Sequence, residues 1–442
     1  MDPVRGAEQF EARRLDKPKL GEDVERLMED QPHAWPPQKF NRAQLLAVAL
    51  LQNPQLELMR TQVRAAQAHE ITAGEVANPD LTLQSEYARH DSHPWLYGLS
   101  LTWLLRSTER RRLDHEIARL DTSAANFELM EKSWALRRDL AAAVSAWEGS
   151  RRRLALLDSL ARSQDRLLAL ETRRVEAGED APSELLLARQ SRLEIERQRG
   201  ELRADSDTAQ AAAARVLGVL PQALDGVNID WPDWGEPPAV DERRQRELRE
   251  QALLSRADLE IAIRGYAIAE SKLKQSVARQ YPQLTLGPGY YWDHGIAKFP
   301  FDVGFTLPLN RNRGEIAEAR AARDIAGQRL LALQADIDGA IAAAERAESL
   351  ARARTDAAEQ QYASARRQAG LAQLGVRLGA SGSQERIGFE IIAARAQLEV
   401  IQMRLELQAA RNALEDVLHM PLSGPELGLA HVWSSTSAGA GS

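Results

Sequence analysis

The sequence predicts a mainly α-helical chain that carries two β-hairpins suited to a membrane β-barrel. Three observations predict this fold class: two very long segments of strong helix formers, a tandem repeat, and a pair of alternating strands in each repeat. The chain has 442 residues, of which 44% are hydrophobic and 27% are charged, so broad disorder is excluded. This length is sufficient for two or three domains.

The composition excludes several classes of protein. A net charge of −7 provides no basic surface, which argues against a nucleic-acid partner. The absence of cysteine excludes disulfides, thiolate metal sites and cysteine nucleophiles. No apolar run approaches the roughly 18 residues that a membrane-spanning helix needs.

The chain is a tandem repeat. Residues 53–83 align without a gap to residues 256–286, and the alignment pairs Pro79 with Pro282. After the aligned part, each copy continues with a hairpin, a long helical stretch, a break and a second helix. One architectural unit therefore occurs twice.

The repeat sets the expected division of the chain. We expect an N-terminal segment at 1–40, a first repeat at 41–221, an insert at 222–243, a second repeat at 244–421 and a C-terminal tail at 422–442.

The helices follow from composition. Residues 106–177 and 314–378 are rich in Ala, Leu, Arg, Glu and Gln and contain almost no Pro, and return helices at 184–218 and 384–419 follow Gly-containing breaks. Much of their apolar content is alanine, so one chain would bury too little apolar area. We therefore expect several helices to assemble into a larger coiled coil, although the helices alone also fit an ordinary antiparallel coiled coil.

The hairpins at 80–105 and 283–309 favour a membrane protein. In the second strand of each, the apolar residues share one face: Tyr97, Leu99, Leu101, Trp103 and Leu105, then Phe301, Val303, Phe305, Leu307 and Leu309. Such alternation over about ten residues is typical of a tilted transmembrane strand, although soluble antiparallel sheets also alternate. Four strands cannot close a barrel and lipid does not tolerate open edges, so we expect three chains to supply twelve strands.

From about residue 40 to residue 421, the chain resembles the TolC-like outer-membrane efflux family. The resemblance rests on the tandem repeat, on PDLTL and PQLTL at the hairpins, on LPLNRNRGEIAEARA (307–321) and on RVEAGEDAPSELLLARQ (174–190). The LPLNRNRG run is most similar to the branch that serves heavy-metal pumps of the cobalt–zinc–cadmium type. The resemblance implies a homotrimer with a twelve-stranded barrel above a periplasmic helical tunnel, and an equatorial domain built from the N-terminal segment, the insert and the tail.

The resemblance also implies a function. Such channels lie in the bacterial outer membrane, reach into the periplasm, and receive substrate from an inner-membrane transporter through a periplasmic adaptor. We find no catalytic motif, so we expect no enzyme activity, no cofactor and no metal centre. The substrate implied is a heavy-metal cation, with drug efflux or type I secretion as alternatives.

A soluble coiled-coil scaffold is the alternative from another class. The start of the chain lacks the apolar stretch of a secretory signal, which favours the scaffold unless the start is truncated or mature. The paired hairpins and their many aromatic residues oppose it.

The acids at the helical breaks are candidate gate residues. These are Glu179, Asp180 and Glu184 at the first break and Glu385 at the second. Threefold symmetry would turn them into acidic rings that favour cations at a pore entrance. The simpler interpretation is that they are first-turn acids, which stabilise a helix N-terminus without any further role.

Two further expectations concern the same region. By resemblance, Arg173, Arg174 and Gly178 are candidate adaptor-docking residues. The second break, within 368–390, contains more glycine, so we expect a longer turn there.

Two minor features complete the sequence pattern. The hairpin loops contain His90, Asp91, His93, Asp293 and His294, which could form a weak metal contact or an ordinary polar surface. We interpret two tryptophans of the first long helix, at 134 and 147, as packing anchors.

Overall fold

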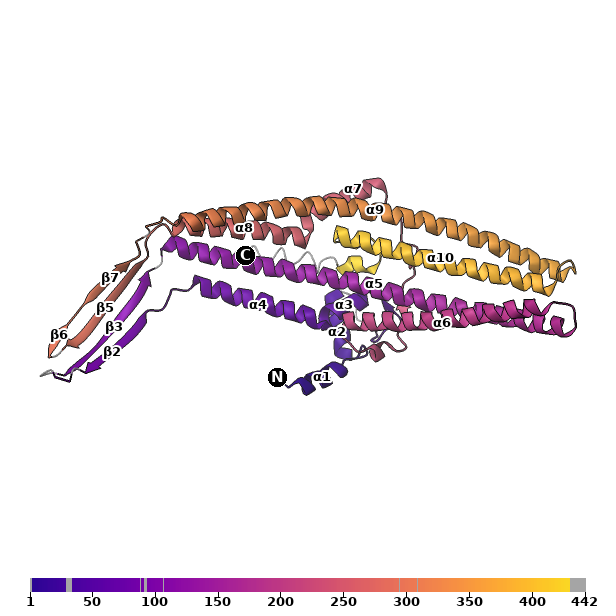
Figure 1. Cartoon of the computed structure of the whole chain (residues 1–442), viewed down its shortest axis with the longest axis horizontal. Helices are drawn as coiled ribbons and strands as arrows, with labels where there is room; N and C mark the ends of the chain where they lie inside the picture. Colours follow the sequence, from indigo (N-terminus) through magenta and orange to yellow (C-terminus); the bar gives the residue numbers. More distant parts are fainter. Residues whose placement is uncertain are drawn as a thin grey trace. The chain divides into compact units, whose positions relative to one another are not determined.

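The computed structural model describes residues 2–28, 34–87, 89–90, 94–105, 107–293, 295–307 and 309–429. The chain forms two compact units, and each contains segments of both repeats (Figure 1). The helical unit comprises 1–57, 132–256 and 336–442, and the strand unit comprises 58–131 and 257–335.

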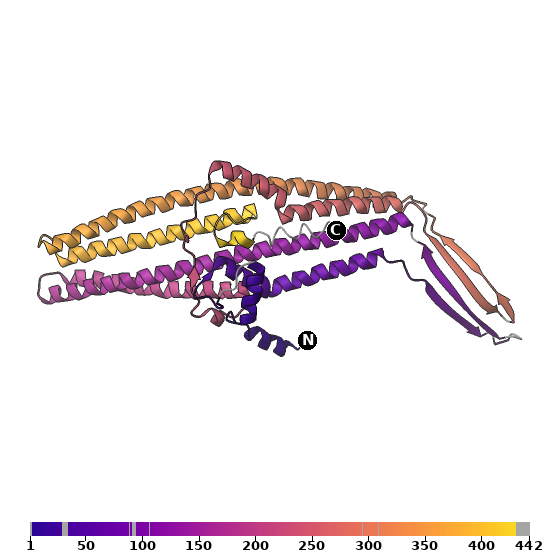
Figure 2. The same cartoon turned by 180° about the vertical axis from the view of Figure 1, so that it is seen from behind.

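The elements follow one another in a repeated order (Figures 1 and 2). The α-helices are α1 (Pro3–Glu11), α2 (Pro18–Met28), α3 (Arg42–Gln52), α4 (Pro54–Gly74), α5 (Thr108–Glu176), α6 (Pro182–Leu217), α7 (Glu242–Ser255), α8 (Ala257–Ala278), α9 (Arg313–Arg377) and α10 (Ser383–Leu418). The strands are β1 (Phe40–Asn41), β2 (Asp80–Tyr87), β3 (Trp95–Leu105), β4 (Ile229–Asp230), β5 (Leu284–Asp293), β6 (Ile296–Lys298) and β7 (Phe301–Phe305). Short 3₁₀ helices are η1 (Pro221–Leu224) and η2 (Pro425–Leu429).

The long helices agree closely with the sequence prediction. The helix α5 has 69 residues and α9 has 65, and the return helices α6 and α10 have 36 each. No described helix is both long enough and apolar enough to cross a membrane.

The two hairpins form one antiparallel sheet in the strand unit, with β3 of the first hairpin paired to β5 of the second. The register places Leu83 opposite Leu99, Leu99 opposite Tyr290, and Thr285 opposite Gly304. The strand order is β2-β3-β5-β6, and β7 also pairs with β5.

The last strand is shorter than predicted. We expected it to reach residue 309, but β7 ends at Phe305. The sequence has a proline at position 308, and proline offers no N–H to a strand ladder. Leu307 and Leu309 therefore lie outside the strand, and Leu309 N donates to Leu307 O at 2.9 Å.

The core of the helical unit joins α5, α6 and α10. Its buried residues include Leu157 and Leu160 of α5, Ile195 of α6, and Ile387 and Ile391 of α10. The two predicted packing anchors of α5 are confirmed, because the tryptophans at 134 and 147 are 3% and 5% exposed.

The insert packs tightly against the helical unit. Trp231 and Trp234 are buried, and the guanidinium carbons of Arg42 and Arg152 lie 4.6 Å from their respective ring centroids. The short strands β1 and β4 pair in parallel and connect the end of the N-terminal segment to the insert. The amino-acid pattern does not predict this pair, because two-residue strands carry no readable alternation.

A buried ion network connects α5, α10 and η2. Arg137, which is 2% exposed, donates to Glu426 at 2.7 Å and to Glu415 at 2.5 Å. Leu422 N donates to the other oxygen of Glu415 at 2.9 Å. Since a buried charge is tolerated only when it is paired, these contacts hold the segment after α10 against α5.

Candidate functional site at the two helical turns

The first turn, residues 177–181, connects α5 to α6. Gly178 has a φ of 73°, which ends the helix in the left-handed conformation that glycine favours. Gly178 N donates to Val175 O at 3.1 Å, and Glu179 N donates to Arg174 O at 2.8 Å. These bonds satisfy carbonyls that the end of α5 would leave without partners.

The second turn, residues 378–382, connects α9 to α10 and has the same length. Gly379 also has a φ of 73° and donates to Val376 O at 3.2 Å, while Ala380 N donates to Gly375 O at 2.8 Å. The expectation of a longer second turn was therefore wrong, because Gly375 continues α9. A Cβ on Gly375 would lie 2.7 Å from Ser381 Oγ, so the turn approaches the helix closely at this position and a larger residue would displace the Ser381 side chain.

An ion pair closes the first turn. Arg174 Nε donates to Asp180 Oδ2 at 2.6 Å, and Arg174 Nη2 donates to Asp180 Oδ1 at 3.1 Å. This fork is bidentate, which adds geometric specificity to the charge attraction. The hydrogen bond from Arg174 lowers the pKa of Asp180, so that carboxyl stays ionised to lower pH than usual. Glu179 lies farther from Arg174, at 4.0 Å, and its side chain is 61% exposed.

Glu171 is a buried acid beside the first turn that the sequence pattern did not predict. It is 3% exposed and precedes Arg174 by one turn of α5. Burial raises the pKa of Glu171, and the neighbouring charge of Asp180 raises it further. The available signal was its place on the buried stripe that Leu157 and Gln164 occupy at spacings of seven residues.

The remaining acids lie in helix first turns. Glu184 is exposed in the first turn of α6, and its backbone N donates to Ala181 O at 3.1 Å. Glu385 occupies the same place in α10 and is also exposed. Both carboxylates are favourable near a helix N-terminus, so their positions fit the simpler interpretation as well as a gate.

The candidate docking residues have different surroundings. Arg173 is exposed at the end of α5, whereas Arg174 is engaged with Asp180. A Cβ on Gly178 would meet no atom within 4 Å, so its backbone is open to a partner.

The hairpin loops lie partly outside the described residues. Asp91, His93 and His294 belong to the undescribed positions. Asp293 forms an ion pair with Lys298 and is thereby occupied. No described contact joins Asp293 to His90, so the weak metal contact remains a prediction.

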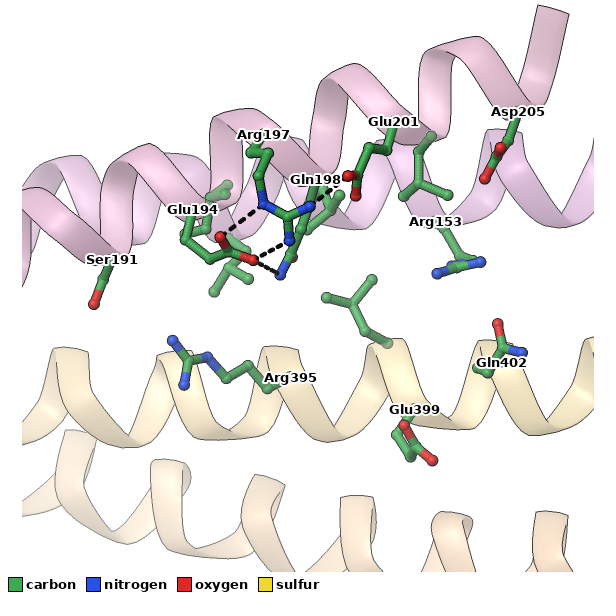
Figure 3. Close-up of a pocket in the computed structure, with 15 residues that line it drawn as sticks. Arg153, Ser191, Glu194, Arg197, Gln198, Glu201, Asp205, Arg395, Glu399 and Gln402 are labelled. Atoms are coloured by element: carbon green, nitrogen blue, oxygen red, sulfur yellow. Dashed lines mark hydrogen bonds and ion pairs between the residues drawn. The ribbon is translucent and has the colours of Figure 1, made fainter.

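A groove of about 650 Å³ opens between α6 and α10 (Figure 3). Its lining includes apolar side chains: Leu157, Leu160, Ile195, Leu202 and Leu398. Arg197 donates to Glu194 at 2.9 Å and lowers the pKa of Glu194 to about 2. Within the described part of the chain, Arg395 and Glu399 of the opposite wall have no ion-pair partner. Most of these apolar side chains belong to the buried core, with Leu157, Leu160 and Ile195 each at most 2% exposed, so the groove presents mainly its charged walls.

Comparison with known proteins agrees with this architecture. Residues 45–219 match the family model for outer membrane efflux proteins. No curated protein sequence matches the chain.

Several solved structures share the fold. The outer-membrane channel OprN is 18% identical, with 93% of this chain and 98% of that chain covered and a TM-score of 0.71. The outer membrane protein VceC of Vibrio cholerae is 17% identical, with coverage of 86% and 97% and a TM-score of 0.69. The outer membrane channel MtrE of Neisseria gonorrhoeae is 16% identical, with coverage of 86% and 89% and a TM-score of 0.68. The chain therefore has the fold of outer-membrane channels, and its first repeat carries the sequence pattern of outer membrane efflux proteins.

Proposed function

We propose that the chain is the outer-membrane exit channel of a tripartite efflux pump and works as a homotrimer. One observation carries the proposal: the sheet is open at both edges and apolar on its surface. Among the described residues, the edge strand β2 pairs with β3 alone, and all eight of its residues are exposed. On the other edge, β7 has β5 as its one described partner.

The open edges favour closure by further copies. Lipid provides no partners for edge N–H and C=O groups, so a membrane sheet must close on itself. Pairing β2 of one copy with β7 of the next is a head-to-tail contact, and such contacts form a ring when the rotation between copies closes. Three copies supply twelve strand positions when β6 and β7 count as one interrupted strand.

The exposed side chains fit a lipid-facing wall. Leu83 is 74% exposed, Phe301 62% and Phe305 61%, which would be unfavourable in water. Aromatic pairs gather toward the loop ends of the strands, with ring centroids 6.4 Å apart for Tyr97 and Trp292. Girdles of this kind mark the interfaces of membrane barrels.

The helices of the strand unit favour the same contact between copies. The helix α8 lies between α5 and α9, since Ser271 bonds Glu116 at 3.1 Å and Arg279 bonds Glu315 at 3.1 Å. The outer helices α4 and α9 expose apolar residues: Leu58, Ile71, Ile325 and Leu331. Joining α4 of one copy to α9 of the next would cover both sets.

We further propose that the two turns line the periplasmic entrance. Glu179, Asp180, Glu184 and Glu385 would form the acidic lining that attracts cations. Such a lining, together with the LPLNRNRG run, supports heavy-metal cations as the substrate. A drug-efflux or type I secretion channel is the rival within transport.

The partners in this proposal are a periplasmic adaptor and an inner-membrane transporter. The open backbone at Gly178 and the exposed Arg173 offer contacts for the adaptor beside Arg174. The groove between α6 and α10 offers a second contact, because its free Arg395 and Glu399 can pair with charges on a docking helix.

The test is the assembly state in membranes. The chain is expressed behind a cleavable signal peptide and extracted with detergent, and we expect a mass three times the 49.1 kDa of one chain. The matched variants are Leu99→Arg on the apolar face of β3 and Ser100→Arg on the opposite face. An arginine facing lipid costs about 2–4 kcal/mol, so L99R should fail to insert while S100R inserts. A soluble monomer or dimer, or equal insertion of the two variants, would favour the coiled-coil scaffold.

The substrate needs a separate test. Host cells that lack their own channel are given this chain with a metal-type or a drug-type transporter and its adaptor. We expect resistance to zinc or cobalt with the metal-type set. Resistance restored only with the drug-type set would overturn the heavy-metal part of the proposal and leave the channel intact.

A further inference from the structure

Glu171 precedes Arg174 by one turn of α5, and Arg174 holds the carboxyl of Asp180 in a bidentate fork, so the buried carboxyl of Glu171 adjoins that of Asp180 at the first turn. Two ionised carboxylates are both hydrogen-bond acceptors, so neither can satisfy the other. Within the described residues, Glu171 Oε2 has no hydrogen-bond partner, although the residue is 3% exposed. A buried acceptor without a donor costs free energy that one shared proton removes.

We propose that Glu171 and Asp180 share one proton and that loss of this proton loosens the turn at 177–181. Arg174 positions the pair, because its fork holds the ionised Asp180 while Glu171 donates to it. Glu171 is thus a positioning residue for the first turn. The consequence for gating rests on the proposed function, in which this turn lines the channel entrance.

The surrounding charges set the direction of the response. The charged groups that act on Glu171 are Asp180 of the turn, Glu184 of α6 and Arg174 of α5. Burial has the largest effect and raises the pKa of Glu171, and the two acids raise it further. Arg174 lowers it by less, so the pKa of Glu171 lies above the usual value. The tight form of the turn binds a proton that the loosened form releases. The stability of the tight form therefore falls as pH rises through the raised pKa of Glu171.

Asp180 limits the response at the acidic end. Its pKa is lowered by Arg174, so the stability contributed by the fork is present at ordinary pH and is lost as pH falls through that lowered pKa. The first turn should therefore be tightest between the lowered pKa of Asp180 and the raised pKa of Glu171.

The second turn offers an internal control. In the second long helix, Ala372 occupies the position that Glu171 occupies in the first, and it is also buried. The places of Arg174 and Asp180 are taken by Gly375 and Ser381. No described group at these places titrates, so the second turn should not respond to pH in this range.

The experiment uses single spin labels on the full chain, which contains no cysteine of its own. The matched positions are Ala177→Cys and Leu378→Cys, the first residues of the two turns. Label mobility is measured from acidic to mildly alkaline pH in the detergent-extracted protein. We expect mobility at 177 to increase with pH and mobility at 378 to stay constant. Glu171→Gln, which mimics the protonated acid, should abolish the increase at 177.

Three results would overturn the shared proton. These are an increase at 177 that persists in E171Q, the same increase at 378, or no increase at all. Should E171Q fail to fold, Glu184→Gln serves instead, because removing one negative neighbour must move the midpoint to lower pH. An unmoved midpoint also overturns the proposal.

Conductance in planar bilayers separates this inference from the proposed function. Channels whose open probability follows the mobility at 177 support the gating consequence. If label mobility at 177 depends on pH but the protein forms no channel, the shared proton stands and the gating consequence is overturned.

Discussion

The two helical turns share one backbone and differ in almost every side chain that could carry charge. Both end their long helix with a glycine at a φ of 73° and use the same pattern of backbone hydrogen bonds. The first then adds Arg174, Asp180 and Glu179, where the second has Gly375, Ser381 and Ala380. The same backbone conformation therefore forms at the second turn without an ion pair, so the charges of the first turn can adjust how tightly that turn is held rather than determine its shape.

The difference continues into the helices. The first long helix buries Leu157, Gln164 and Glu171 at intervals of seven residues, and Gln164 donates to Ala188 O of α6 at 3.1 Å. At the corresponding places the second buries Ala358, Ala365 and Ala372. Alanine allows close helix packing in α9, whereas α5 contains buried polar groups that need partners. Near the turn, the second pair of helices, α9 and α10, is therefore built mainly for packing, whereas the first pair, α5 and α6, also contains a buried acid.

Ala372→Glu tests the packing side of this comparison. It places a carboxyl at a buried position, and the residue three positions further on is Gly375 rather than an arginine. An uncompensated buried charge costs about 3 kcal/mol. We expect a marked drop in the urea midpoint of unfolding. The control is Ala380→Glu in the exposed turn, which should change stability by less than about 0.5 kcal/mol. Equal effects of A372E and A380E would contradict the difference in packing.

Arg174→Met removes the cation of the first turn. Asp180 and Glu171 then face one another without compensation, and we expect a small loss of stability, since Arg174 is itself partly exposed. Hydrogen exchange of the amides in 177–181 should accelerate, while exchange in 378–382 stays unchanged. The matched control, Arg173→Met, changes an exposed neighbour and should leave both turns as they are. Faster exchange in both turns would show that the ion pair acts through general loosening.

Gly178→Ala and Gly379→Ala test the shared backbone. Both glycines have positive φ and open space around the new Cβ, so each substitution should cost about 1 kcal/mol through backbone strain alone. Chemical unfolding of the two variants should give nearly equal losses. A clearly larger loss at one turn would mean that side chains, rather than the backbone, determine its geometry.

Glu184→Gln and Glu385→Gln should have the smallest effects. Each removes a favourable charge from a helix first turn, worth about 0.3–1 kcal/mol at low salt and less at high salt. Equal small losses would agree with the helix-terminus interpretation of both acids. A larger loss for E184Q would indicate that Glu184 also interacts with the Glu171–Asp180 pair. The unfolding midpoints of both variants, measured at two salt concentrations, distinguish these two outcomes.

The amino-acid pattern alone was sufficient for the four longest helices, for the two β-hairpins apart from the end of the last strand, and for the position of the first turn. Helix propensity, alternation and glycine breaks act between neighbours along the chain, so they are readable without a fold. For the same reason, the acids at 179, 180, 184 and 385 could be placed near the turns from their spacing.

Tertiary contacts decided the rest. The β3–β5 pairing, the helical place of Gly375 and the packing of Trp231 and Trp234 all depend on residues distant in sequence or across a turn. The burial of Glu171 is the sharpest case, because an acid in a long charged helix looks solvated until its partners are known. Propensity is local and burial is not, so the acid that matters most to the first turn is the one that the sequence pattern hid.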